Sequence, residues 1–188
     1  MPRFIIVHME KRLYKWASLE YEHLAELVGK EKVLFTNLTK SMAEKLSVFG
    51  KTTTKPIEKI PLTKPCLLDP HADKTLTPEY TKQFSDFIFG GILGDFPPQK
   101  RTRELVKILP RIPRRNLGKQ QMSTDTAVFV TKKICDGIPL EKLLFQDGYT
   151  ISAGKDIEME LPYRYVVNRG KIIFSEKLKR YLKKKKGF

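Results

Sequence analysis

The chain has 188 residues, of which 40% are hydrophobic, and its formal net charge is +15. This length suits one domain with a core large enough to fold without a disulfide or metal. No apolar run approaches the roughly 18 residues of a membrane span, and the charged opening MPRFIIVHMEKR has no signal-peptide cleavage site. We therefore expect a cytoplasmic protein with no membrane contact. Its two cysteines, Cys66 and Cys135, are expected to be reduced thiols, with a disulfide as the less favoured alternative.

The positive charge is gathered in two segments. Between Lys100 and Lys119 there are eight Lys or Arg residues and one Glu, and between Ser175 and Phe188 there are seven and one. These segments carry 13 of the 15 net charges, so the rest of the chain is close to neutral. Such clusters indicate contact with RNA or a ribonucleoprotein surface, while a solvated helix face and a solvated tail are the alternatives.

Hydrophobic periodicity predicts strands and helices that alternate along the chain. From the N-terminus these are strand Phe4–Met9, helix Trp16–Val28, strand Lys32–Leu38, helix Ser41–Phe49, strand Cys66–Pro70, helix Thr77–Phe84, strand Phe87–Ile92, helix Arg101–Leu109, the strand-like stretch Arg111–Leu117 and helix Ser123–Ile134. Ser123 is the expected N-cap of that last helix, and Gly137 its stop. This alternation predicts an α/β fold with a mainly parallel sheet.

After Asp147 the pattern changes. Ile157–Val167 and Lys171–Phe174 look extended, with a turn at residues 168–170 between them, and a short cationic helix ends the chain. Ligands of parallel sheets bind at the carboxyl ends of the strands. That rule places Asp69, the segment Gly90–Asp95 and the segment Leu117–Ser123 along one edge of the predicted sheet.

The segment FIFGGILGDFPPQKR contains three glycines that open the backbone to a ligand. A phosphate-binding P-loop would need a lysine after its glycines, whereas Gly94 is followed by Asp95, which would repel a phosphate. The dinucleotide-binding pattern requires a different glycine spacing at the first strand–helix turn. A carboxylate in a glycine loop suits a cationic or zwitterionic ligand such as S-adenosylmethionine, and a purely structural glycine turn is the alternative.

The stretches FGGILGDFPP, RTREL and RRNLGKQQMSTDTAV resemble the SPOUT class of S-adenosylmethionine-dependent methyltransferases. More closely, the chain is similar to a small branch of that class. This branch includes predicted RNA methyltransferases and a fungal enzyme that methylates an arginine of a small-subunit ribosomal protein. The opening HME, Trp16 with LEY, the CLLDP strand and LPYRYV also match the branch, so the resemblance runs from about Phe4 to about Val167.

The resemblance implies a mainly parallel sheet flanked by helices, with a deep trefoil knot in the C-terminal half. Residues 1–150 would form the knotted methyltransferase domain, and residues 151–188 a β-rich extension with a basic tail packed on it. The knot loops would bind S-adenosylmethionine through Phe89, Gly90, Gly91, Leu93, Gly94, Asp95, Leu117, Gly118, Gln121, Met122, Ser123 and Thr124. Alternatively, Leu117 and Met122 belong to the core, and Ser123 is only a helix cap.

Methylation of an arginine requires carboxylates that attract the guanidinium and receive its proton. The candidate catalytic residues are Glu10, Glu20, Asp69 and His8, with Tyr21 as a further polar contact and Trp16 as a platform for the guanidinium. Each has a structural alternative: core packing for Trp16 and His8, solvent exposure for Glu20, and turn chemistry for Asp69. Asp125, at the start of a helix, would complement the helix dipole.

An RNA acceptor would be held differently, with Arg101, Arg103, Arg114 and Arg115 binding phosphates. A protein arginine in a ribosomal protein or subunit is the favoured acceptor, and RNA is the second. A non-catalytic RNA-binding or ribosome-assembly protein is the third alternative. No metal is expected, and both a monomer and a homodimer remain open.

Overall fold

The computed structural model describes residues 1–91, 102–154 and 157–185. Its strands are β1 Arg3–His8, β2 Val33–Thr36, β3 Lys51–Thr52, β4 Pro65–Leu68, β5 Asp86–Gly91, β6 Arg114–Arg115, β7 Leu144–Gly154, β8 Ile157–Asn168 and β9 Lys171–Ile172. Its helices are α1 Lys15–Val28, α2 Lys40–Leu46, α3 Pro78–Thr81, α4 Thr102–Ile108, α5 Thr124–Cys135 and α6 Glu176–Lys185, with short 3₁₀ turns at Lys30–Lys32, Ile57–Lys59 and Leu140–Lys142. The predicted residues Leu93, Gly94, Asp95 and Arg101 lie outside the described residues.

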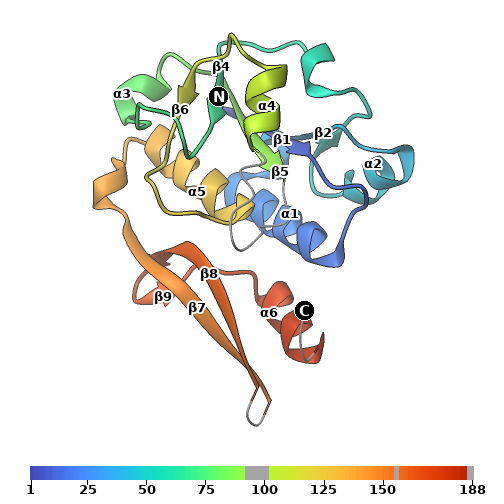
Figure 1. Cartoon of the computed structure of the whole chain (residues 1–188), viewed down its shortest axis with the longest axis vertical. Helices are drawn as coiled ribbons and strands as arrows, with labels where there is room; N and C mark the ends of the chain where they lie inside the picture. The colour runs from blue at the N-terminus through green and yellow to red at the C-terminus, as the bar shows by residue number, and fades with distance from the viewer. Residues whose placement is uncertain (92–101, 155–156, 186–188) are drawn as a thin grey trace.

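Six strands form one parallel sheet in the order β3-β2-β1-β5-β4-β6 (Figure 1). Strand β1 is at its centre and is almost wholly buried, which explains its nearly continuous apolar sequence. Phe4 and Ile6 point to one face of the sheet, where α1, α2, α3 and α5 pack, whereas Ile5 and Val7 point to the face covered by α4. The predicted α/β fold with a mainly parallel sheet is therefore confirmed.

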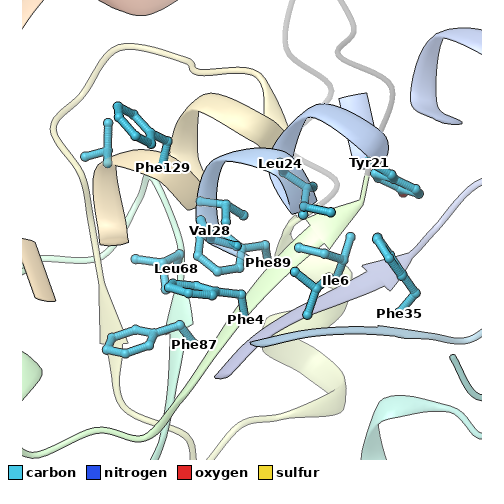
Figure 2. Close-up of a cluster of buried hydrophobic side chains, with 14 of the residues drawn as sticks. Phe4, Ile6, Tyr21, Leu24, Val28, Phe35, Leu68, Phe87, Phe89 and Phe129 are labelled. Carbon is cyan, nitrogen blue, oxygen red and sulfur yellow. The ribbon is translucent and has the colours of Figure 1, made fainter. Parts of the chain in front are cut away.

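The larger core lies between the sheet and the α1–α5 helix pair. Figure 2 shows Phe4, Phe87 and Phe89 of the sheet facing Leu24 and Val28 of α1. These side chains are almost fully shielded from solvent, so they fix α1 firmly above the central strands. This packing determines where the polar residues of α1 lie.

A second, antiparallel sheet of order β7-β8-β9 lies on the other side of α1 (Figure 1). Its apolar face and α6 pack on Leu19 and Trp16, so α1 is covered by both sheets. Strand β8, β9 and the turn between them agree with the predicted extended segments. Strand β7 was not predicted, because a register shift around Gly148, whose φ is +80°, interrupts its apolar–polar alternation.

The remaining predicted elements are present with shifted ends. The helix predicted over Thr77–Phe84 is confined to Pro78–Thr81, and only Arg114 and Arg115 pair in the stretch after Pro113. Ser123 precedes α5 as expected, but its hydroxyl bonds the Thr126 hydroxyl at 2.9 Å instead of a backbone N–H. Both cysteines are thiols, and no helix among the described residues is long and apolar enough to cross a membrane. The predicted knot involves residues 92–101, so it stays a prediction, as does the division of the chain at residue 150.

Candidate active site

Strands β1 and β5 end side by side at the carboxyl edge of the parallel sheet. His8 and Gly91 are register partners there, and the Met9 N–H donates to the Gly91 carbonyl at 3.2 Å. A side chain at position 91 would overlap the Tyr21 hydroxyl and lie 2.9 Å from Ile6 Cγ2. This position therefore requires glycine because α1 approaches the end of β5 closely.

Two of the predicted cofactor loops, as far as they are described, meet at the same edge. The Thr124 hydroxyl, at the start of α5, donates to the Gly90 carbonyl at 3.5 Å. The Gln121 carbonyl accepts from the Arg164 N–H at 2.8 Å, which ties the loop before α5 to β8. Gly118 takes a φ of +94° and donates its N–H to Asn116 Oδ1 at 3.0 Å. The loops that contain Gly90 and Thr124 therefore meet, whereas Gly118 bonds within its own loop.

Three side chains of these loops also contribute to the core. Phe89 and Leu117 are buried in the cluster beneath α1 and α5, and Met122 packs against that cluster. The alternative of a core role for Leu117 and Met122 agrees with the structure. Contact with a cofactor would come from the backbone around them.

Two buried carboxylates, Glu20 of α1 and Asp125 of α5, form what we call the acid pair. Glu20 is 5% exposed and Asp125 is 3% exposed. Glu20 directly follows Leu19 on α1, Asp125 directly follows Thr124 on α5, and these two helices pack against each other. Burial, followed by the negative charge of Asp125, raises the pKa of Glu20 well above its usual range. Glu20 therefore favours its protonated form when the site is empty, and a cation bound beside the acid pair would favour the ionised form.

Aromatic and imidazole rings hold the acid pair in place. The Trp16 indole N–H donates to Glu20 Oε1 at 2.7 Å, and His23 Nδ1 lies 2.6 Å from Asp125 Oδ2. Tyr165 of β8 lies near the acid pair. Burial raises the pKa of its hydroxyl, and the negative charges of Glu20 and Asp125 raise that pKa further. These contacts join α1, α5 and the small sheet into one site.

Sequence reasoning missed His23 and Tyr165 and gave Asp125 only a helix-dipole role. His23 lies three residues after Glu20, so the two side chains are neighbours on the surface of the predicted helix, and the sequence alone could have indicated this. Its partner Asp125 is 102 positions away, and nothing in the sequence pattern connects them. Only the packing of α1 on α5 brings these groups together.

His8 and Tyr21 form a buried polar contact next to the acid pair. His8 Nδ1 lies 3.0 Å from the Tyr21 hydroxyl, and the His8 residue is 1% exposed. Burial lowers the pKa of His8 and raises that of Tyr21, so the imidazole and the phenol are both neutral near pH 7. A backbone hydrogen bond with Arg12 acts in the opposite direction on the pKa of His8, but the effect of burial is larger.

The other two predicted acids have different surroundings. Glu10 follows β1 in a bend, and its charge raises the pKa of both His8 and Tyr21, so it lies near that contact. Asp69, at the end of β4, accepts from the His71 N–H at 2.9 Å and from Arg114 Nη1 at 3.0 Å. The turn role that was the alternative for Asp69 is therefore present in the structure.

Three of the four arginines predicted to bind substrate are described, and their surroundings differ. Arg114 pairs with Asp69, and the Arg115 guanidinium lies over the Tyr80 ring at 4.5 Å from its centroid. Arg103 is exposed on α4.

The parallel sheet, with the loops after β5 and before α5 meeting at its carboxyl edge, agrees with the SPOUT class of S-adenosylmethionine-dependent methyltransferases. The dual-specific Trm10 of Thermococcus kodakaraensis has this fold, and its crystal structure has a TM-score of 0.63 and 19% identity over 76% of this chain and 96% of that one. At this identity the likeness shows the fold alone.

The chain belongs to the family described as "Protein arginine N-methyltransferase SFM1-like", whose model matches residues 3–187. Protein arginine N-methyltransferase SFM1 of Saccharomyces cerevisiae is 38% identical over 201 residues, which cover 97% of this chain and 94% of the relative. The crystal structure of the yeast enzyme with SAM has a TM-score of 0.90 and 36% identity, covering 98% of this chain and 91% of that one. Its complex with SAH has a TM-score of 0.88 and 35% identity, covering 96% and 94%. The predicted family and fold are confirmed, and the predicted methyl donor is bound in the relative.

Proposed function

We propose that this chain transfers a methyl group from S-adenosylmethionine to an arginine side chain of a protein. The observation that carries the proposal is the buried acid pair, Glu20 and Asp125, in a member of a family described as arginine methyltransferases. Each acid directly neighbours a residue that contacts the end of β5: Tyr21 packs on Gly91, and Thr124 bonds Gly90. An arginine side chain is a permanent cation with a fork of N–H donors, for which carboxylates are the matching acceptors.

The residues at the carboxyl edge fit a bound methyl donor. Residues 118–122 before α5 are partly or fully exposed beside this edge, and glycine backbone such as that of Gly118 lets an adenosine or a zwitterion approach closely. When bound, the cofactor supplies an electrophilic methyl group on a sulfonium. The proposed binding residues remain the twelve predicted from sequence, nine of which are described: Phe89, Gly90, Gly91, Leu117, Gly118, Gln121, Met122, Ser123 and Thr124.

The acid pair accounts for the fate of the proton. Methylation would form an N–C bond on the guanidinium as the S–C bond of the sulfonium breaks, leaving a neutral thioether. An N–H bond also breaks, and the methylated guanidinium is again a cation, so one proton leaves in each turnover. Glu20 suits this task because a bound guanidinium would favour its ionised form, and a carboxylate whose pKa burial raises takes up a proton more readily than an exposed one. Asp125 supplies the second negative charge, and its contact with His23 fixes its orientation.

His8, Tyr21, Glu10 and Asp69 complete the proposed set. His8 and Tyr21 are neutral and border the acid pair, so they shape the approach to it without adding charge. Glu10 extends the negative field at the end of β1. Asp69 already accepts hydrogen bonds from the His71 N–H and from Arg114, so it would contact the acceptor only through the remaining lone pairs of its carboxylate.

We further propose a ribosomal protein or subunit as the partner and the cytoplasm as the compartment. Helix α6 buries Leu178 and Leu182 and exposes Arg180 and the lysines at 183–185. Lys177 is paired with Glu22 of α1 at 2.6 Å, which fixes the start of this helix. A basic, amphipathic helix with a fixed position suits a surface that contains RNA phosphates.

The proposal is tested by incubating the protein with methyl-labelled S-adenosylmethionine and purified ribosomal subunits. Protein and RNA are then separated, and labelled protein is hydrolysed to identify the modified amino acid. We expect label in methylarginine, with Glu20→Gln and Asp125→Asn each lowering the rate about a hundredfold or more.

Two results would count against the proposal. Label confined to RNA would make the chain an RNA methyltransferase. No binding of S-adenosylmethionine by calorimetry would leave a non-catalytic RNA-binding or assembly role.

A further inference from the structure

Trp16 lies one helical turn before Glu20 on α1, with its indole N–H on the Glu20 carboxylate. The Nε1–Oε1 distance is 2.7 Å, and Glu20 is 5% exposed, so water has little access to this bond. The ring itself packs on the small sheet and α6, in the cluster that contains Leu19, Leu178 and Leu182. The surroundings therefore fix the indole in one orientation.

We infer that Trp16 is a positioning residue of the methyl-transfer site, whose indole N–H orients the Glu20 carboxylate toward the guanidinium. This inference rests on the proposed function. It differs from a role for Trp16 as a platform that stacks on the substrate, because here the indole acts through Glu20. An indole donor suits the task, since it never titrates and accepts nothing in return.

The charges around Glu20 explain why the carboxylate requires a donor. Asp125 of α5 opposes ionisation of Glu20, and the Tyr21 and Tyr165 hydroxyls, whose pKa values are raised, remain neutral. His23 is engaged with Asp125. The Trp16 N–H lowers the pKa of Glu20, against the larger effects of burial and Asp125. Loss of this donor would leave Glu20 less able to bind a cation at neutral pH.

The test is a double-mutant cycle with Trp16→Phe and Glu20→Gln, using ribosomal subunits and methyl-labelled S-adenosylmethionine. Trp16→Phe keeps an aromatic ring and removes the N–H. We expect it to lower kcat/KM about tenfold or more at pH 7, because a hydrogen bond to a charged group is lost. Tyr181→Phe is the matched control: it changes a polar aromatic side chain of the same cluster, on α6, and should alter the rate less than about twofold.

Two readouts distinguish positioning from direct contact. In the Glu20→Gln background, Trp16→Phe should have no further effect on the rate. In the wild-type background it should move the acidic limb of the pH–rate profile to higher pH, since Glu20 then ionises less readily. Binding of S-adenosylmethionine, measured by calorimetry, should be unchanged and would show that the variant is folded.

Additive losses in the cycle, or an unshifted pH profile, would overturn the inference and assign Trp16 to the substrate or to packing. The outcome is separate from the proposed function. If the wild-type protein methylates no arginine, the function is wrong. If it does methylate arginine while Trp16→Phe retains the full rate, only the role of Trp16 is wrong.

Discussion

Replacing Gly91 by alanine tests how closely α1 approaches the end of β5. The new Cβ would overlap the Tyr21 hydroxyl, lie 2.9 Å from Ile6 Cγ2 and lie 3.1 Å from the Val7 carbonyl oxygen. Tyr21 and Ile6 are each at most 1% exposed, so neither can move into solvent (Figure 2 shows Tyr21 on α1 and Ile6 on the sheet below it). The methyl group must therefore displace buried atoms.

Overpacking of this kind costs about 1–3 kcal/mol, and the backbone oxygen among the neighbours favours the upper half of that range. For a chain of this length the melting temperature should fall by about 5–10 °C. Unfolding in urea gives the free energy, and calorimetry with S-adenosylmethionine reports the effect on the edge of the sheet. We expect weaker cofactor binding together with the loss of stability.

The second change, Tyr21→Phe, removes the atom that the alanine methyl would overlap. Alone it should cost about 1 kcal/mol, because the hydrogen bond to His8 Nδ1 at 3.0 Å is lost. Together with Gly91→Ala it should cost less than the sum of the two, by about 1 kcal/mol or more. Purely additive free energies, or a Gly91→Ala protein as stable as the wild type, would refute this account of Gly91.

Three further predictions concern charged residues. Below about pH 4.5 Glu20 is protonated in both the folded and the unfolded chain. Because its pKa is raised in the folded chain, rising pH ionises it more readily when the chain unfolds, and the wild type loses stability. The stability of Glu20→Gln relative to the wild type should therefore increase from pH 5 to pH 8, and a constant difference in urea unfolding would contradict the burial argument. Asp69→Asn keeps the turn acceptor but removes the ion pair with Arg114, which is 41% exposed. It should cost at most about 1 kcal/mol of stability and, since Asp69 belongs to the proposed acceptor site, lower methyl transfer about tenfold or more, whereas a rate within about threefold of the wild type would remove Asp69 from that site. Replacing the lysines at 183–185 by glutamine should lower the salt dependence of binding to ribosomal subunits by about two units of slope, and an unchanged slope would exclude α6 from RNA contact.

The sequence determined the order and type of most elements. Phe4–Met9 is apolar on both faces and therefore belongs in the middle of a parallel sheet, where the structure has β1. Trp16–Val28 has an apolar stripe with helical spacing and forms α1. The glycine loop and its partner stretch before α5 carried the resemblance to the family, which the comparisons confirm. These features are local, so the residue pattern alone specifies them.

The tertiary structure decided which acids meet and which do not. Glu20 and Asp69 were equivalent candidates in the sequence, yet Glu20 is buried near Asp125, whereas Asp69 bonds its own turn and Arg114. The contact between His23 and Asp125 spans 102 positions, and strand β7 is recognisable only through its pairing with β8. Local patterns report the burial and secondary structure of each segment. They carry no information on which distant segments share one site, because that depends on how the helices pack on the sheet.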